Sequence, residues 1–188
     1  MNIFKRTISV LFVGFFVSAC ATTPTKDIHV DAEAAPMFAL SDYSTYGWLG
    51  SAQIIYDPEG KWEPPNVDLD AEFQRLIDRE LHKRGMTQVA RRPDLIVAYI
   101  AGVDTSALEL KEDPKEKISM LQNIPKGGLV ILLIDGRTAA VVWAGAAVGD
   151  VQQQPSVDVV RKRLDYAVSK IFKRLPKHPA QTGYSDAY

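Results

Sequence analysis

The chain has 188 residues with 22 basic and 23 acidic side chains, which gives a formal net charge of −1 at pH 7. This balance argues against a nucleic-acid-binding protein, because such proteins usually have a strong excess of basic residues. The length suits one domain with its own hydrophobic core, and the single cysteine cannot form a disulfide within the chain, so packing alone must hold the fold.

The first residues have the pattern of a secretory signal peptide. Lys5 and Arg6 precede an apolar run that is too short to cross a bilayer as a helix, since crossing takes about 20 residues. The run ends in the tetrapeptide Val17–Cys20, which resembles the lipobox of bacterial lipoproteins. The resemblance implies that residues 1–19 are removed, that the Cys20 thiol receives a diacylglycerol, and that the new amino group is acylated. A plain signal peptide that happens to end in cysteine is the alternative.

The residue after the cysteine bears on the destination of the protein. Lipoproteins retained in the inner membrane of many Gram-negative bacteria have Asp at this position, whereas this chain has Ala21. The resemblance therefore implies an outer-membrane lipoprotein whose domain faces the periplasm. The chain without residues 1–19 has 20 basic and 23 acidic residues, a net charge of −3.

The segment after Cys20 is small, polar and aperiodic and contains Pro24 and Pro36, which predicts a flexible tether over residues 20–36. A single domain is expected over residues 37–177. Residues 178–188 show no periodicity and are expected to form a loose tail.

The first half of the domain predicts a strand, a loop and a helix. Aromatic and β-branched residues favour a strand over Leu40–Leu49, and the prolines and glycine of residues 57–66 favour a loop. Apolar residues at helical spacing predict a first helix over residues 69–84, with Asp68 as its N-cap and Gly85 at its end.

The second half predicts three more strands and a helix. A short strand is expected over Met86–Val89 and a stronger one over Leu95–Ala101. Two apolar stretches, Leu129–Ile134 and Ala139–Val148, flank Asp135-Gly136, a pair of residues that favours a tight hairpin turn.

One transmembrane helix over residues 128–148 is the alternative to the hairpin, but it would place Asp135 and Arg137 near the middle of the bilayer. Insertion scales set the cost of that placement at about 2.5 to 3.5 kcal/mol for each charge.

An apolar stripe predicts a second helix over Val157–Leu175, stopped by Pro176. The order of the elements predicts an α+β fold, with a mainly antiparallel sheet of four to five strands and two helices packed on one face.

Several segments together are similar to those of lipoproteins that carry the domain of unknown function 4136. The segments are Asp42–Trp48, Pro93–Tyr99, Gly128–Asp135, Val142–Gly145 and Ile171–Pro176. The resemblance supports the location and the fold, and it implies no mechanism. Members of that family commonly have a basic residue between the Trp and the Gly of the fourth segment, where this chain has Ala144.

No metal or cofactor site is predicted. The three histidines, His29, His82 and His178, lie in different segments and have no ligand spacing. Asp68, Asp70 and Glu72 resemble the start of a calcium loop, but the Gly and distal Glu of an EF-hand are missing. The three acidic residues are better explained by the electrostatics of a helix N-terminus.

No catalytic motif is found, and the protein is predicted not to be an enzyme. Asp94 and Asp135 stand at strand ends, where a carboxylate could act in catalysis, but both also suit turns. His82 lies beside Lys83 and Arg84, which indicates a solvated surface. A triad assembled from distant residues stays open, because its members need only meet in space.

The second helix carries a basic face. It could meet anionic lipopolysaccharide or a lipid surface, or it could pair with the acidic stretch Asp57–Glu80 of the same domain. The basic residues are Arg161, Lys162, Arg163, Lys170, Lys173 and Arg174.

Both faces of the predicted sheet are apolar, whereas a sheet with one wet face should alternate. Since two helices cover one face, something else must cover the other. The candidates within the chain are the loop with Tyr56 and Trp62, which are also the candidate binding residues, and the excursion over Asp104–Lys126. A second copy, another protein or a lipid are the candidates outside it.

The leading hypothesis is a non-enzymatic periplasmic binding or assembly domain, held at the outer membrane by lipid on Cys20. Its expected partners are the membrane, through the lipid, and an envelope protein or amphiphile, and self-association stays open. A hydrolase of envelope polymer with an unrecognised active site is the alternative function.

Overall fold

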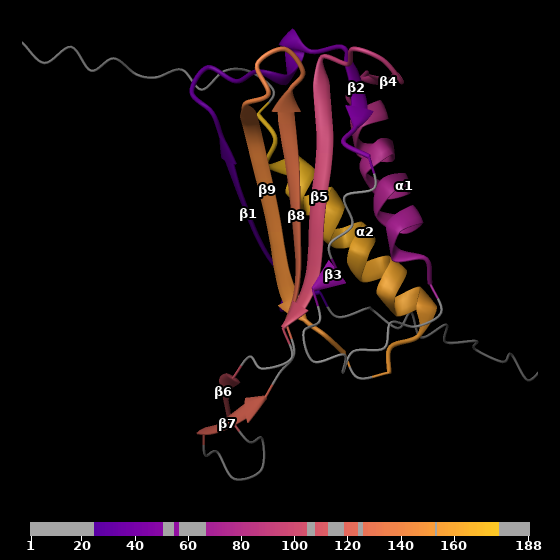
Figure 1. Ribbon diagram of the computed structural model, residues 1–188. Helices are drawn as coiled ribbons and strands as arrows, with labels where there is room; N and C mark the ends of the chain where they lie inside the picture. Colours follow the sequence, from indigo (N-terminus) through magenta and orange to yellow (C-terminus); the bar gives the residue numbers. More distant parts are fainter. Residues whose placement is uncertain are drawn as a thin grey trace, which may run out of the picture.

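The computed structural model describes residues 25–50, 55–56, 67–104, 108–112, 119–123, 126–152 and 154–176. Two helices lie on one side of a twisted sheet, and a small two-stranded ribbon lies beyond one end of that sheet (Figure 1). The helices are α1 (Leu69–His82) and α2 (Val157–Lys173), and a 3-10 turn, η1, covers Leu40–Asp42. The strands are β1 (His29–Ala34), β2 (Thr45–Trp48), β3 (Ile55–Tyr56), β4 (Thr87–Gln88), β5 (Leu95–Asp104), β6 (Leu108–Glu112), β7 (Ser119–Asn123), β8 (Lys126–Asp135) and β9 (Val141–Asp150).

The large sheet has seven strands, in the order β1-β9-β8-β5-β2-β4, with β3 pairing beside the far end of β5. The pairs β1/β9, β9/β8 and β8/β5 are antiparallel, whereas β2 and β3 pair with β5, and β4 with β2, in the parallel sense. The α+β class and the two helices on one face agree with the prediction. The predicted mainly antiparallel sheet of four to five strands is wrong in part, because the sheet is mixed and larger.

The extra antiparallel strand comes from the predicted tether. Residues 29–34 form β1, which pairs with β9 from His29 opposite Val148 to Ala34 opposite Trp143. The boundary at residue 36 was therefore wrong. The inward side chains of β1 are small or only half-buried, so they give a weak period-two signal, and the strand is stabilised by its pairing with β9.

The predicted first strand over residues 40–49 is shorter in the structure. The 3-10 turn η1 occupies Leu40–Asp42, and β2 begins at Thr45. The short strand β4 lies within the predicted Met86–Val89, and β5 begins at Leu95 as predicted.

Residues 128–148 form the predicted hairpin, β8–β9, and not the alternative transmembrane helix. The residues that the structure describes include no helix long and apolar enough to cross a membrane.

Both helices begin at side-chain caps. Asp68 accepts a hydrogen bond from the N–H of Ala71 at 3.0 Å, and Ser156 accepts one from Val159 at 3.3 Å. Gly85 follows α1 with a positive φ of 82°, a backbone conformation that glycine adopts without strain.

The core lies between the helices and one face of the sheet. Alternate residues of β5, β8 and β9 meet the apolar stripes of α1 and α2 there, as the period-two and 3.6-residue patterns require. The largest fully buried side chains are Trp143, Tyr46, Phe172, Leu76, Ile77, Leu81, Leu95, Ile131, Leu133 and Ile171.

Candidate functional site

The other face of the sheet is apolar, and no described element packs on it. We call it the open face. The open face results from strand alternation. Leu95, Val97 and Tyr99 of β5 point into the core, so the residues between them in the sequence point to the opposite face. Two of its residues are exposed, Ile100 at 43% and Val148 at 47%, whereas Ala98 at its centre is buried. The open face consists of Ile96, Ala98, Ile100, Val130, Leu132, Ile134, Ala144, Ala146 and Val148.

One edge of the open face is charged. Register places His29, Asp31 and Glu33 of β1 beside the open-face residues of β9, and all three are exposed. The described part of this face is therefore an apolar centre with an acidic border along β1.

A pocket of about 150 Å³ lies on the helix side of the sheet, at the end where β5 finishes and β8 begins. We call it the end pocket. Its walls are almost wholly apolar. Phe73 and Leu69 come from α1, Val160 and Leu164 from α2, and Leu129 from β8.

Small residues create the end pocket. Ala101 of β5, Ala147 of β9 and Ala167 of α2 face it where longer side chains fill the rest of the core. Gly127 and Gly149 also line the pocket, and a side chain at either position would be crowded. A Cβ on Gly149 would lie 3.0 Å from Cγ1 of Ile28, and one on Gly127 would lie 3.3 Å from Cγ2 of Val151.

The rim of the end pocket includes an ion pair. Arg163 of α2 donates from Nη1 to Oδ1 of Asp27 at 3.0 Å, and the N–H of Asp150 donates to Oδ2 of Asp27 at 2.8 Å. Burial alone would raise the pKa of Asp27, but these hydrogen bonds outweigh it and hold the pKa below its ordinary value. Ile28, the next residue, lines the pocket.

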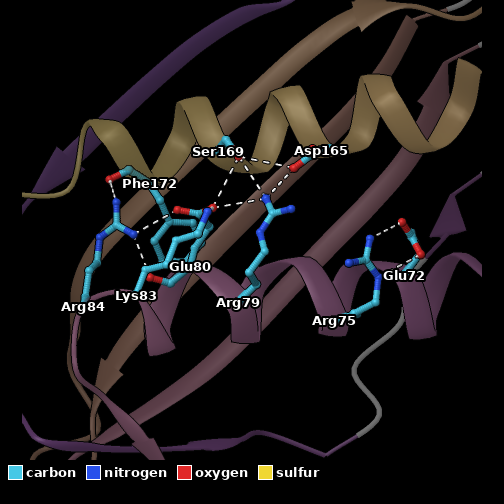
Figure 2. A network of polar contacts seen from close by, with 9 residues as sticks. All are labelled: Glu72, Arg75, Arg79, Glu80, Lys83, Arg84, Asp165, Ser169 and Phe172. Atoms are coloured by element: carbon cyan, nitrogen blue, oxygen red, sulfur yellow. Dashed lines mark hydrogen bonds and ion pairs between the residues drawn. The ribbon is translucent and has the colours of Figure 1, made fainter.

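A second polar cluster joins the two helices (Figure 2). The carboxylate of Glu80, which is 5% exposed, accepts from Lys83 at 2.8 Å and from Arg84 at 3.0 Å. Burial raises the pKa of Glu80, but the hydrogen bonds lower it by more. Arg79 of α1 reaches across to Asp165 and Ser169 of α2. The charges therefore bind one another and fix how the helices pack.

Both aspartates considered for catalysis make structural contacts: Asp94 joins the start of β5 to the start of β2, and Asp135 acts as a turn residue. Asp94 accepts from the N–H of Ser44 and from the N–H and hydroxyl of Thr45 at 2.8 to 3.0 Å, which lowers its pKa. Asp135 accepts from Thr138 and Arg137 within the hairpin turn and from the hydroxyl of Tyr43.

The two histidines in the described part of the chain, His29 and His82, lie on different elements. His29 is exposed on β1, and His82 is exposed at the end of α1 with its ring 5.9 Å from that of Tyr46. His178 lies outside the described residues. Within the described part of the chain, no group of three metal-binding side chains occurs. At the start of α1, Asp68 caps the helix, as a helix N-terminus predicts, while Asp70 accepts from Tyr99 and Glu72 pairs with Arg75.

Three of the six basic residues on the basic face of α2 have partners within the domain. Arg163 binds Asp27, Arg161 lies 4.0 Å from Glu72, and the ammonium of Lys170 lies 5.1 Å from the ring centre of Tyr166. The other three basic residues of this face are exposed, namely Lys162, Lys173 and Arg174.

Two of the predicted site residues, Cys20 and Trp62, lie outside the described residues. Most of the loop that was a candidate to cover the open face lies outside them as well. Tyr56 lies in β3, where its backbone is in register with Gly102 of β5.

Sequence reasoning missed the end pocket and the role of Asp78. The side chain of Asp78 accepts from the hydroxyl of Tyr46 at 2.7 Å and from the indole N–H of Trp48 at 3.2 Å. These two hydrogen bonds explain why Tyr46 and Trp48 are two positions apart in the Asp42–Trp48 segment. The pocket had a faint signal, the small residues at Gly127-Gly128 and Ala146-Ala147.

Comparison with known proteins gives one solved structure with a similar fold and the same family name. It is a DUF4136 family protein from Bacteroides thetaiotaomicron, which matches with a TM-score of 0.53 at 11% identity, over 81% of this chain and 99% of that chain. No curated protein matches the sequence.

Two further solved structures match with lower scores. A PDZ domain protein from Parabacteroides distasonis has a TM-score of 0.49 at 14% identity, over 81% of this chain but only 37% of that chain. The chain thus spans little more than a third of that protein. A PelC dodecamer from Paraburkholderia phytofirmans has a TM-score of 0.47 at 15% identity, over 79% of this chain and 96% of that chain.

The family model described as "Domain of unknown function (DUF4136)" matches residues 29–177. This range starts at the first residue of β1 and extends past the end of α2, so it includes the whole sheet and both helices. The family resemblance that the sequence motifs indicated is confirmed. The chain belongs to the DUF4136 family.

Proposed function

We propose that this protein is an outer-membrane-anchored bacterial lipoprotein whose periplasmic domain binds another envelope protein through the open face and catalyses no reaction. The tetrapeptide Val17–Cys20 supports the lipid anchor, and Ala21 supports sorting to the outer membrane. The observation that carries the binding function is the open face itself.

An apolar surface that is left accessible to water commonly marks a binding site. On the open face, Ile100 of β5 and Val148 of β9 expose 43% and 47% of their surface, while the core side of the same strands is closed by α1 and α2. The cost of leaving these side chains in water is recovered when a partner covers them.

The border of the open face defines the chemistry of the partner. Asp31 and Glu33 are exposed along β1, next to the apolar centre. A matching surface has an apolar centre flanked by lysine or arginine, and such complementarity raises the association rate and excludes wrong partners.

A hydrolase of envelope polymer is the rival function, and the use of the carboxylates disfavours it. Asp94, Asp135 and Glu80 each accept several hydrogen bonds, from the start of β2, from the hairpin turn and from neighbouring cations, respectively. A general base must be free to take a proton from a substrate or water. These three carboxylates are held in their ionised form by structural contacts.

Cross-linking of the membrane-attached protein in cells, followed by purification and identification of the captured proteins, tests the open face. We expect the Ile100→Lys and Val148→Lys variants to lose the captured partner, because each places a charge in the apolar centre. The matched control is Met37→Lys, because Met37 is 70% exposed and lies in the turn after β1.

Thermal melts establish that all three variants are folded. Equal capture by all three would overturn the proposal. Capture of a second copy of this chain, lost in the same two variants, would replace the partner protein by self-assembly.

A further inference from the structure

The end pocket lies beside the segment that leads to Cys20. We infer that this pocket holds the terminal methylene segment of one of the acyl chains carried by Cys20 of the same chain whenever that acyl chain is outside a bilayer. The inference rests on the lipidation in the proposed function, and it concerns a pocket on the helix side of the sheet, which shares Val148 with the open face.

The first argument is the chemistry of the end pocket. Leu69 and Phe73 of α1, Val160 and Leu164 of α2, and Leu129 of β8 form its walls. An acyl chain has no hydrogen-bonding groups to satisfy, so a wall of this kind favours it over any polar ligand.

The second argument is the origin of the space. The sheet and α2 meet here through Ala101, Ala147 and Ala167, where the neighbouring layer of the core has Tyr99, Ile131 and Ile171. Small residues at facing positions leave room for an apolar guest that the described residues do not fill.

The third argument is the route of the chain. Arg163 and the N–H of Asp150 hold Asp27 at the rim, and Ile28 is part of the pocket lining. Cys20 is eight positions before Ile28, and a fully extended chain of that length spans at most about 29 Å. The attachment point of the lipid therefore lies within that reach of the pocket.

The fourth argument is effective concentration. A ligand joined to its site by a short covalent connection is present at roughly millimolar effective concentration. The acyl chain on Cys20 therefore competes well with free lipids for the pocket. Exposure of an acyl chain to water is unfavourable, so we expect occupancy in aqueous solution and release when the chain enters a bilayer.

Photo-cross-linking of the lipidated protein tests this inference. Cells are fed a fatty acid with a diazirine at its end, and the mature protein is purified, diluted below the critical micelle concentration of its detergent and irradiated. We expect a covalent link between the acyl chain of the Cys20 lipopeptide and a peptide of β9 or α2.

A matched pair of variants on β9 locates the site. Ala147→Leu fills the end pocket and should reduce the intramolecular link at least tenfold. Ala146→Leu adds the same side chain on the open face and should leave it unchanged. Val160→Phe fills the pocket from α2 and serves as the second pocket variant if Ala147→Leu fails to fold.

The possible outcomes separate the two proposals. A lipidated Cys20 peptide with no link to the domain would overturn the inference and leave the lipoprotein function intact. A pocket peptide linked to a phospholipid would overturn the assignment of the ligand to Cys20. An N-terminal peptide without lipid mass would overturn the lipidation itself.

Discussion

Asp27 and Arg163 are 136 positions apart in the chain and form an ion pair at one end of the sheet. Asp27 also accepts from the N–H of Asp150, so one carboxylate joins the segment before β1, the end of β9 and α2. The segment expected to be a tether is therefore bound to the domain from Asp27 onward.

The first prediction concerns this carboxylate. The side chain of Arg163 is only 12% exposed, and a lost hydrogen bond to a charged group costs about 1.5 to 3 kcal/mol. We expect Asp27→Ala to lower the free energy of unfolding of the mature chain by that amount, measured by urea denaturation. Glu33→Ala, at an exposed position of β1, should change it by less than about 0.5 kcal/mol. Equal effects of the two variants would contradict the role given to Asp27.

Truncation of the chain before Met37 removes part of the domain. Residues 29–34 form β1, a strand of the large sheet. In the truncated chain, β9 would lack the partner strand β1, and Arg163 would lack Asp27. We therefore expect a chain that starts before Asp27 to have a higher free energy of unfolding in urea than one that starts at Met37.

The helices and the hairpin could be predicted because their signals are local. Apolar residues repeat along Leu69–His82 and Val157–Lys173 at helical spacing, and Asp135-Gly136 marks the turn between two apolar stretches. Each of these patterns lies within one short window of the chain.

The parallel strands and the candidate sites could not be predicted in this way. The pairing of β2 with β5 joins residues some 50 positions apart, and β2 has only four residues. The end pocket depends on short side chains at Ala101, Ala147 and Ala167, which meet only in the folded protein. Short side chains produce no periodic pattern in the sequence, so the sequence does not predict the cavity that they leave.

The Trp143-Ala144-Gly145 segment leads to a prediction about close packing. A Cβ on Gly145 would lie 2.5 Å from Cγ2 of Ile171 and 2.5 Å from the ring of Trp143. We expect Gly145→Ala to cost about 1 to 3 kcal/mol of stability, as overpacked cores do. Gly128→Ala is the control, because a Cβ there meets nothing within 4 Å. Equal melting temperatures for the two variants would contradict this explanation of the glycine.

Glu80 gives a prediction about buried charge. Its carboxylate accepts from Lys83, Arg84 and Ser169 while only 5% exposed. We expect Glu80→Gln to lower the free energy of unfolding by about 1.5 to 3 kcal/mol, because the remaining amide cannot satisfy those donors. Asp158→Asn, in the exposed first turn of α2, should cost less than about 0.5 kcal/mol. Denaturant titrations of both variants make the comparison.

Asp135 predicts how stability depends on pH. Hydrogen bonds from the N–H groups of Thr138 and Arg137 lower the pKa of Asp135 from 3.8 to about 2. The ionised form is therefore favoured by folding, and its contribution is complete above pH 3.8 and is lost as the pH falls toward 2. We expect Asp135→Asn to be less stable than the unchanged protein at neutral pH and to differ from it least near pH 2. Melting temperatures across this range provide the measurement, and a gap that widens in acid would contradict the prediction.

The last prediction concerns the lipid on Cys20. Each buried methylene contributes about 0.8 kcal/mol to membrane binding, so several acyl chains together hold a protein at the membrane essentially permanently. We expect Cys20→Ser to leave a precursor without lipid, and any cleaved form of it to appear in the soluble fraction. Cell fractionation with mass measurement of the N-terminal peptide tests this, and Ser18→Ala, a small-residue change in the same tetrapeptide, is the control that should keep the lipid. A mature Cys20→Ser protein of lipidated mass in the membrane fraction would contradict the lipobox interpretation, because serine has no thiol to receive the diacylglycerol.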